Sequence, residues 1–462
     1  MLAARRIEPS RGLLVAGVLM AAAVIGYLAG TSPKFALAAA IGSGFVLLVF
    51  VDLAAGLALF GFFGFLELLE MGSIVSVGKL GGGLLALAWL GVIASRYDAR
   101  NDFLVVHPWM SVTIALFLGW SLLSISWADD TGAALGVSLR FALNALLFLI
   151  VFTAIRTRRH AVMLTGAFVA GATAATAYGL LNLSSDLYAG RLTGSGLDPN
   201  ELASALVAGV ALSAALAFNL KRSSGLRLAA IGAGAFCLFG IFLTVSRGGM
   251  LALGTALIAA ILFSGRWRLR VVIATLLIAA TTFVYFSAIA SPEARDRISS
   301  STAGENRVPD GRTTIWAIGW RMFEAHPLNG VGAGNFQNSA KDYLLQPGVL
   351  QRSDQVLLSV PQVAHNSYLS VLSQLGLVGL TLFLAIIGFS LTAALRAAGN
   401  FRVRGDPKGE ALARGLAIAM VGSLAADFFI AQELNKQLWL LLGFGPALLA
   451  LSTRAPEDQP GA

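Results

Sequence analysis

The stretch GAFCLFGIFLT, residues 234–244, carries no charged side chain, and similar apolar runs recur along most of the chain. A helix needs about 20 mostly apolar residues to cross the hydrocarbon core of a bilayer. Fourteen windows approach or exceed this length, so we predict an all-α, polytopic bundle of membrane helices. These windows are 13–30, 34–50, 53–70, 79–95, 108–127, 137–155, 160–183, 200–219, 227–245, 248–264, 270–290, 367–396, 411–431 and 436–452.

The composition supports the same class. Hydrophobic residues make up 57% of the chain and charged residues only 12%, whereas soluble proteins average about 25% charged residues. The single cysteine, Cys237, lies inside an apolar run, which excludes a disulfide framework and a thiol metal site. The formal charge of +9 would suggest a nucleic-acid partner, but the basic residues cluster between apolar runs. Membrane topology explains that pattern, so we expect no nucleic acid to bind.

The basic clusters also orient the chain. With the N-terminus inside, most of the 33 Lys and Arg residues fall on the inner side, and the positive-inside rule then places both termini in the cytoplasm. The windows 34–50 and 53–70 meet at Asp52 and are either two spans or a re-entrant pair. The first window follows RRIEPSR but precedes no strong cleavage site, so we interpret it as a span rather than a signal.

The predicted organisation has five parts. They are a cytoplasmic N-terminus at 1–12, eleven spans at 13–290, an external loop with interfacial helices at 291–366, three spans at 367–452 and a cytoplasmic tail at 453–462.

The external loop is the one long polar stretch, and its tryptophans, glycines and spaced arginines favour a site over a tether. Arg312, Trp316, Trp320 and Glu324 recur every four residues, so they share one side of a short helix that Asp310 opens. Arg312 would stand near the positive end of that helix, a favourable place for phosphate. Tryptophans suit the membrane interface, so we predict that this helix lies on the bilayer.

A glycine-rich segment follows this helix. Gly330, Gly332 and Gly334 superficially resemble a phosphate-cradling loop, but no strand precedes them. We favour a plain turn before a helix at Phe336–Leu345.

Two shorter outer segments contain arginines. In GRLTGSGLDPNELA, residues 190–203, Asp198 and Glu201 fit a capping arrangement, whereas Arg191 is either a surface charge or a ligand. In TVSRGGM, residues 244–250, Ser246 is placed to cap the next span and Arg247 to begin it. Arginine snorkels readily at interfaces, but the outer face is where it is least expected, so we favour anion binding by Arg247.

The segment AHNSYLSVLSQLGLVGL, residues 364–380, places His365 just outside the twelfth window, with Asn366 or Ser367 as its helix cap. A positive helix end and nearby arginines would disfavour protonation of His365 and keep its imidazole available as a base. The other histidines lie on the cytoplasmic side, at 107 and 160, or before a proline, at 326.

Charged residues inside spans normally face a cavity or a partner. Arg140 is predicted about one turn inside the sixth window, and Asp427 lies inside the thirteenth. Either of them lines an acceptor groove or pairs with another charge, and the nearby Gln432, Glu433 and Asn435 are candidates of the same kind.

Four motifs, in this order, resemble those of the O-antigen ligase and Wzy-type polymerase superfamily of bacterial envelope glycosyltransferases. They are R-x-T-G…D-P-N from Arg191 to Asn200, S-R-G from Ser246 to Gly248, G-R…W…H-P-L-x-G-V-G-x-G-N-F from Gly311 to Phe336, and H-N-S-Y-L…G-L-x-G-L from His365 to Leu380. The resemblance covers roughly residues 190–380, and the first third of the chain agrees only in hydropathy.

The resemblance implies a GT-C-like fold and transfer of a glycan from an undecaprenyl-diphosphate carrier to an acceptor hydroxyl, at the periplasmic face of the bacterial inner membrane. In the ligase branch, which we favour, the acceptor is the lipid A-core. The family's catalytic histidine falls on His365 and its diphosphate-binding arginines fall on Arg247 and Arg312. Because the family usually has about twelve spans, we expect about 12–14 here.

The residues themselves agree with this chemistry. A lipid diphosphate is an activated leaving group, and arginine forks stabilise its developing charge without a metal. The outer segments contain no Asp-x-Asp motif or clustered carboxylates, so we predict a metal-independent, inverting transfer without a cofactor, in which His365 removes or orients the acceptor proton. The candidate substrate-binding residues are Arg191, Arg140, Asn366, Tyr368 and Trp316.

Two alternatives remain open. A Wzy-type polymerase would transfer the chain to another lipid-linked unit, and Arg191, Arg295, Arg297 and Arg307 would supply its second diphosphate site. A transporter would place ionisable groups near the membrane midplane, often in repeated halves. Here the informative residues cluster at one face and no internal repeat is visible, so the transporter ranks last.

Overall fold

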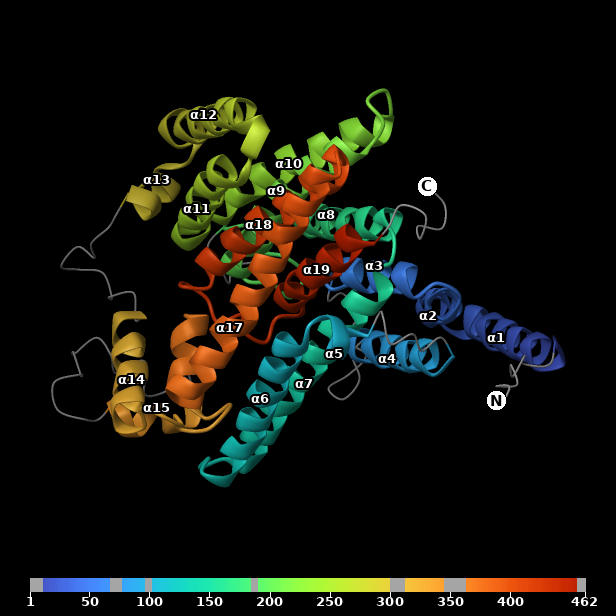
Figure 1. Ribbon diagram of the computed structural model, residues 1–462, viewed down its shortest axis with the longest axis horizontal. Helices are drawn as coiled ribbons and strands as arrows, with labels where there is room; N and C mark the ends of the chain where they lie inside the picture. Colours follow the sequence, from blue (N-terminus) through green and yellow to red (C-terminus); the bar gives the residue numbers. More distant parts are fainter. Residues whose placement is uncertain are drawn as a thin grey trace.

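The computed structural model describes residues 11–66, 77–95, 102–183, 190–299, 312–344 and 363–454, and the regular elements within these ranges are helices. Figure 1 shows them assembled into one bundle. The α-helices are α1 (Arg11–Thr31), α2 (Pro33–Val51), α3 (Leu53–Phe63), α4 (Val77–Ser95), α5 (Phe103–Val106), α6 (Pro108–Leu123), α7 (Thr131–Ala154), α8 (Arg158–Leu181), α9 (Pro199–Asn219), α10 (Gly225–Thr244), α11 (Arg247–Phe263), α12 (Arg268–Val284), α13 (Pro292–Ser299), α14 (Arg312–Ala325), α15 (Phe336–Leu344), α17 (Ser367–Val403), α18 (Pro407–Ala426) and α19 (Lys436–Thr453).

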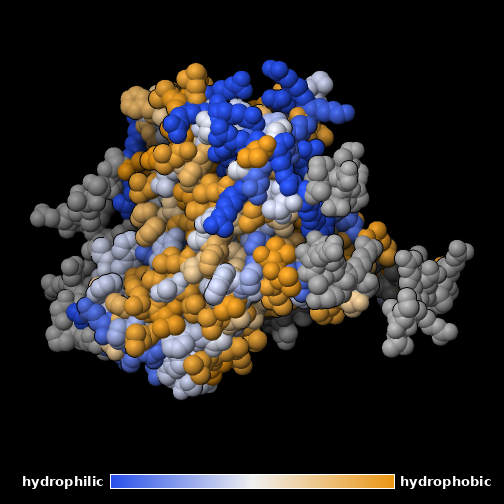
Figure 2. All heavy atoms as spheres, viewed as in Figure 1, coloured by the Kyte–Doolittle hydropathy of each residue, from blue (hydrophilic) through white to orange (hydrophobic). Residues whose placement is uncertain are grey.

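Eight of the described segments are long and apolar enough to cross a membrane, and they include α6, α7, α8, α9, α10, α12, α17 and α18. Shorter apolar stretches lie in α2, α3, α4 and α11. Figure 2 shows a broad apolar surface with hydrophilic residues gathered at one end of it. The prediction of an all-α, polytopic membrane protein is therefore confirmed.

Two of the differences between helix boundaries and hydropathy windows have a clear local cause or consequence. Helix α7 begins at Thr131 rather than at 137, because the Asp130 side chain accepts the N–H of Ala133 and caps it. Asp52 likewise caps α3, but α3 has only 11 residues, which is too short to cross the hydrocarbon core by itself. Asp310, Arg307 and most of the predicted tail at 453–462 lie outside the described residues.

Small residues allow the helices at the centre of the bundle to pack closely. Helix α9 packs against α8, α10, α11 and α18 (Figure 1). A side chain at Gly415 would meet Ala215, and one at Gly422 would meet Val207, so the backbones of α9 and α18 approach closely. Cys237 is fully buried against Gly209, which agrees with its interpretation as a packing residue.

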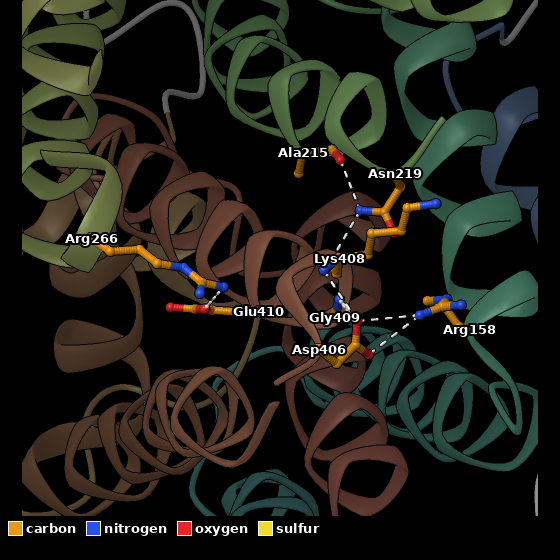
Figure 3. A network of polar contacts seen from close by, with 8 residues as sticks. All are labelled: Arg158, Ala215, Asn219, Arg266, Asp406, Lys408, Gly409 and Glu410. Atoms are coloured by element: carbon orange, nitrogen blue, oxygen red, sulfur yellow. Dashed lines mark hydrogen bonds and ion pairs between the residues drawn. The ribbon is translucent and has the colours of Figure 1, made fainter. Parts of the chain in front are cut away.

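The helices α9, α11, α17 and α19 all begin at the same end of the bundle, which we call the outer end in line with the predicted orientation; the opposite end is the inner end. At the inner end, α18 is fixed by ion pairs (Figure 3). Glu410 is fully buried and accepts from Arg266 at 2.7 Å and from Arg414 at 2.9 Å. Arg158 contacts Asp406 at 3.2 Å, and the Asn219 amide donates to the carbonyl of Lys408.

Candidate functional site

A break in α17 shapes the outer end. Gly376 has φ +66° and ψ −168°, so Ser367–Leu375 form a short helix that is separate from the long apolar part. A β-carbon at Gly376 would lie 2.2 Å from the backbone of Leu328, and the positive φ also excludes other side chains. The glycine in the G-L-x-G-L motif therefore allows the loop after α14 to enter the break.

That loop satisfies the backbone groups that the break exposes. Val331 and Gly332 donate their N–H groups to the carbonyls of Ser373 and Gln374, at 3.0 and 2.9 Å, and Leu377 donates to the carbonyl of Pro327 at 2.9 Å. Backbone hydrogen bonds thus join the loop after α14 to the break in α17, two segments that are far apart in the sequence.

The glycine-rich segment also holds the turn between α6 and α7. The Asn335 side chain is buried, accepts the N–H of Asp130 at 2.7 Å and donates to its carbonyl at 3.1 Å. Gly334 has φ +72° and donates its N–H to the Gln374 side chain. These contacts and the helix at Phe336–Leu344 support the prediction of a turn rather than a phosphate cradle.

His365 stands at the start of α17 in a strained conformation. Its φ of +48° lies in the left-handed region, which costs a non-glycine residue about 1–2 kcal/mol. Asn366 follows as the helix cap and accepts the N–H groups of Tyr368 and Leu369, both at 3.0 Å. His365 is half-buried. Strain of this kind persists where the surroundings impose it, and it often marks functional positions.

Helix α14 is joined to the His365 turn through Trp316. The indole N–H of Trp316 donates to the carbonyl of Ala364, the residue before His365, at 3.1 Å. Arg312, one turn earlier, shares that side of α14 and is half-buried. Trp320 is instead exposed and donates to Glu324 at 2.8 Å.

The two arginine-containing outer segments also meet. Arg191 donates from Nε to the carbonyl of Thr244 at 2.8 Å, and Ser246 donates to the Asn200 side chain at 2.8 Å. Ser246 caps α11, and Arg247 is its half-buried first residue. Arg191 has a structural role, because it holds the backbone at Thr244, the last residue of α10. Substrate binding by Arg191 stays a prediction.

The residues 427–435 between α18 and α19, which we call the outer hairpin, connect these parts. Ser367 donates its N–H to the carbonyl of Asp427 at 2.8 Å and its hydroxyl to the carbonyl of Ile430 at 3.0 Å. A side chain at Gly248 would lie 2.8 Å from Phe429. The hairpin therefore contacts Ser367, two residues after His365, on one side and Gly248, the residue after Arg247, on the other.

The electrostatics at this end favour anions. Helices α9, α11, α17 and α19 point their N-termini toward it, and their caps are Asp198, Ser246, Asn366 and Asn435. Each helix N-terminus carries roughly half a positive charge, Arg247 adds a whole charge at the start of α11, and Arg312 adds one at the start of α14. Diphosphate binding by these arginines stays a prediction.

Two buried carboxyl groups lie in the outer hairpin. Glu433 accepts the Ser370 hydroxyl at 2.5 Å, and Gln374 donates to the same hydroxyl at 2.7 Å. Burial raises the pKa of Glu433, and burial together with the neighbouring Glu433 charge raises the pKa of Asp427. Asp427 follows the last residue of α18 and caps its end, which corrects the expectation that it lies inside a span.

Arg140 is an exposed residue of α7. The nearby Asn144 donates to the carbonyl of Leu434 in the outer hairpin at 2.9 Å, and the Phe141 ring faces Trp439 in the first turn of α19. The candidate span Thr131–Ala154 contains Arg140, and this part of α7 contacts the outer hairpin and the start of α19. Substrate binding by Arg140 stays a prediction.

Tyr368 has partners inside the protein. Its hydroxyl donates to the carbonyl of Leu424 at 2.7 Å, and its ring packs on Phe428. The described residues contain no group of three or more His, Cys, Asp or Glu that is able to hold a metal ion. Substrate binding by Tyr368 and metal independence both stay predictions.

The fold defines a multi-pass helical membrane protein, and the candidate residues Arg247 and His365 lie in segments that the outer hairpin joins. Residues 232–384 match a family model described as O-Antigen ligase, named Wzy_C. The match covers less than half of the chain, and it includes Arg247, Arg312 and His365. It agrees with the resemblance to this superfamily, covers three of the four motifs and supports a function in glycan transfer. No curated protein matches the chain.

Proposed function

We propose that the protein transfers a glycan from an undecaprenyl-diphosphate carrier to an acceptor hydroxyl of the lipid A-core, at the periplasmic face of the bacterial inner membrane. The observation that carries the proposal is the connection of the His365 turn and the start of α11 through the outer hairpin. The hydrogen bond from Trp316 to the carbonyl of Ala364 links α14, which begins at Arg312, to the same turn.

The proposed reaction requires a positioned acceptor hydroxyl and positive charge near the diphosphate leaving group. The acceptor oxygen attacks the anomeric carbon and forms the new glycosidic bond, while the bond from that carbon to the phosphate oxygen breaks. Its electron pair leaves with the lipid diphosphate, and the proton of the acceptor hydroxyl goes to the imidazole of His365. Attack opposite the leaving group inverts the anomeric centre.

In this proposal, Arg247 and Arg312 neutralise the charge that develops on the diphosphate. Guanidinium groups bind phosphate oxygens in a bidentate manner, and such charge stabilisation is usually the largest single contribution to catalysis. The helix N-termini at the outer end add to it. The proposal needs no metal, because the arginines neutralise the charge of the leaving group.

Reconstituted protein with an undecaprenyl-diphosphate glycan, with and without a lipid A-core acceptor, tests the proposal. Product only in the presence of the core acceptor is the expected result, and it should persist in EDTA. A ladder of lipid-linked chains without the core acceptor would identify a polymerase instead. Loss of activity in EDTA would refute the metal-free mechanism.

A further inference from the structure

A small cavity with both polar and apolar lining residues lies beneath the outer hairpin, between α9, α18 and α19. Its volume is about 20 Å³, and a cavity of at least about 10–15 Å³ by this measure holds one water-sized group. The polar residues that line it include Glu201, Ser204, Ser423, Asp427, Gln432 and Gln437, and the described lining contains neither Lys nor Arg.

Asp427 is the unexplained member of this lining. It is 1% exposed, and neither of its carboxylate oxygens has a hydrogen-bond donor among the described residues. Burying an ionised carboxylate without a partner is costly, so such a group needs a compensating cation or a proton. The second carboxyl of the hairpin, on Glu433, is also buried and adds negative charge rather than removing it.

The surroundings of Asp427 favour a cation. Asp427 caps the C-terminal end of α18, where the helix dipole is negative. Ser423 and Gln432 contribute further oxygen atoms. Gln437 donates its amide nitrogen to the carbonyl of Gly64 at 2.7 Å, so its side-chain oxygen remains available as an acceptor. Carboxylate, amide and hydroxyl oxygens are the ligands that hard cations prefer.

We propose that this cavity binds one monovalent alkali cation, Na⁺, with Asp427 as its anionic ligand. Mg²⁺ usually keeps several waters, and Ca²⁺ takes six to eight oxygen ligands. A cavity of about 20 Å³ has little room for either arrangement. C-terminal helix ends and side-chain oxygens are a known way for membrane proteins to bind Na⁺.

Such a cation would stabilise the outer hairpin. Asp427 accepts the Ser367 N–H through its backbone carbonyl, so the ion would anchor the segment that holds the start of α17. The ion would be separate from the diphosphate site and would take no part in the transfer. The inference therefore does not depend on the proposed function, and its test measures binding and stability rather than activity.

The test uses purified full-length protein and follows thermal unfolding in NaCl and in choline chloride at equal ionic strength. A ligand that binds only the folded state stabilises it in proportion to the logarithm of its concentration. We expect the Tm to rise in Na⁺ by on the order of 1–2 °C for each tenfold increase in concentration above the Kd. Asp427→Asn should remove this response. Asp342→Asn, at an exposed aspartate of α15, is the matched control and should keep it.

Equal Tm values in Na⁺ and choline would overturn the proposal and indicate a protonated Asp427. Stabilisation by Ca²⁺ alone, reversed by EDTA, would also overturn it, as would an unchanged Na⁺ response in Asp427→Asn. Equilibrium binding of radioactive Na⁺ to the wild-type protein provides a second measurement that does not require the variant to fold. Binding of about one ion for each chain supports the site, and no saturable binding refutes it.

Discussion

The two ends of the bundle differ in whether their buried carboxyl groups have partners. At the inner end, Glu410 is fully buried and two arginines contact it (Figure 3 shows one of them, Arg266). At the outer end, Asp427 is equally buried and lacks a hydrogen-bond donor among the described residues. The backbone is strained there as well, at His365 and at Val245, which has φ +47°. Completed ion pairs hold the helices together, whereas strain and uncompensated charge at the other end indicate a site for ligands.

The largest effect should come from the outer end. We expect His365→Ala, Arg247→Ala and Arg312→Ala each to lower the transfer rate by about 10²–10⁴-fold, because they remove the base or the charge that stabilises the leaving group. The thermal unfolding of each variant should remain close to that of the wild type. Initial rates in proteoliposomes measure the effect.

His326→Ala is the control for the histidine, because His326 is exposed and lies on the other side of the glycine-rich segment. It should retain wild-type activity. Full activity in His365→Ala would refute the assignment of the base.

The inner end should respond in stability rather than in activity. Glu410→Gln leaves Arg266 and Arg414 without their carboxylate partner, and breaking a buried ion pair costs on the order of 3 kcal/mol. We expect a clearly lower Tm with an unchanged rate for each folded molecule. Glu324→Gln, at an exposed carboxylate, should change neither quantity. A selective loss of activity in Glu410→Gln would break the contrast between the two ends.

A third substitution tests the break in α17. Gly376→Ala forces a β-carbon against the Leu328 backbone at a positive φ, which should destabilise the protein by about 2 kcal/mol or more. Gly388→Ala in the same helix meets no atom within 4 Å and should leave the Tm unchanged or raise it slightly. Equal Tm values for the two variants would show that the loop after α14 does not depend on the glycine.

The smallest effect concerns the link between α14 and the His365 turn. Trp316→Phe removes the hydrogen bond to Ala364, which contributes about 1 kcal/mol, so the transfer rate should fall by about fivefold. Trp320→Phe is the matched control, because Trp320 is exposed and bonds only within its own helix. A similar loss in both variants would assign the effect to the membrane interface rather than to the site.

Local chemistry explains what the sequence could predict about the site. The caps depend on residues two or three positions away. Asp198 and Ser246 form the predicted caps, and Asn366, one of two candidates with Ser367, caps α17. The start of α7 at Thr131 could not be predicted, because hydropathy does not detect that a helix continues beyond its apolar window. The pairing of Gly376 with the loop at Leu328 was also missed, since a G-L-x-G-L motif inside an apolar run reads as an uninterrupted span.

By itself, the sequence determined the helical membrane class, the superfamily and the identity of the three principal candidate residues, because hydropathy and motifs are properties of neighbouring residues. Only the tertiary structure decided that the outer hairpin joins the segments around Arg247 and His365, and that Asp427 lines a small cavity. Burial and hydrogen bonding there arise between residues about 60 or more positions apart, as for Ser367 and Ile430. Such contacts form only when helices pack, so no local pattern encodes them.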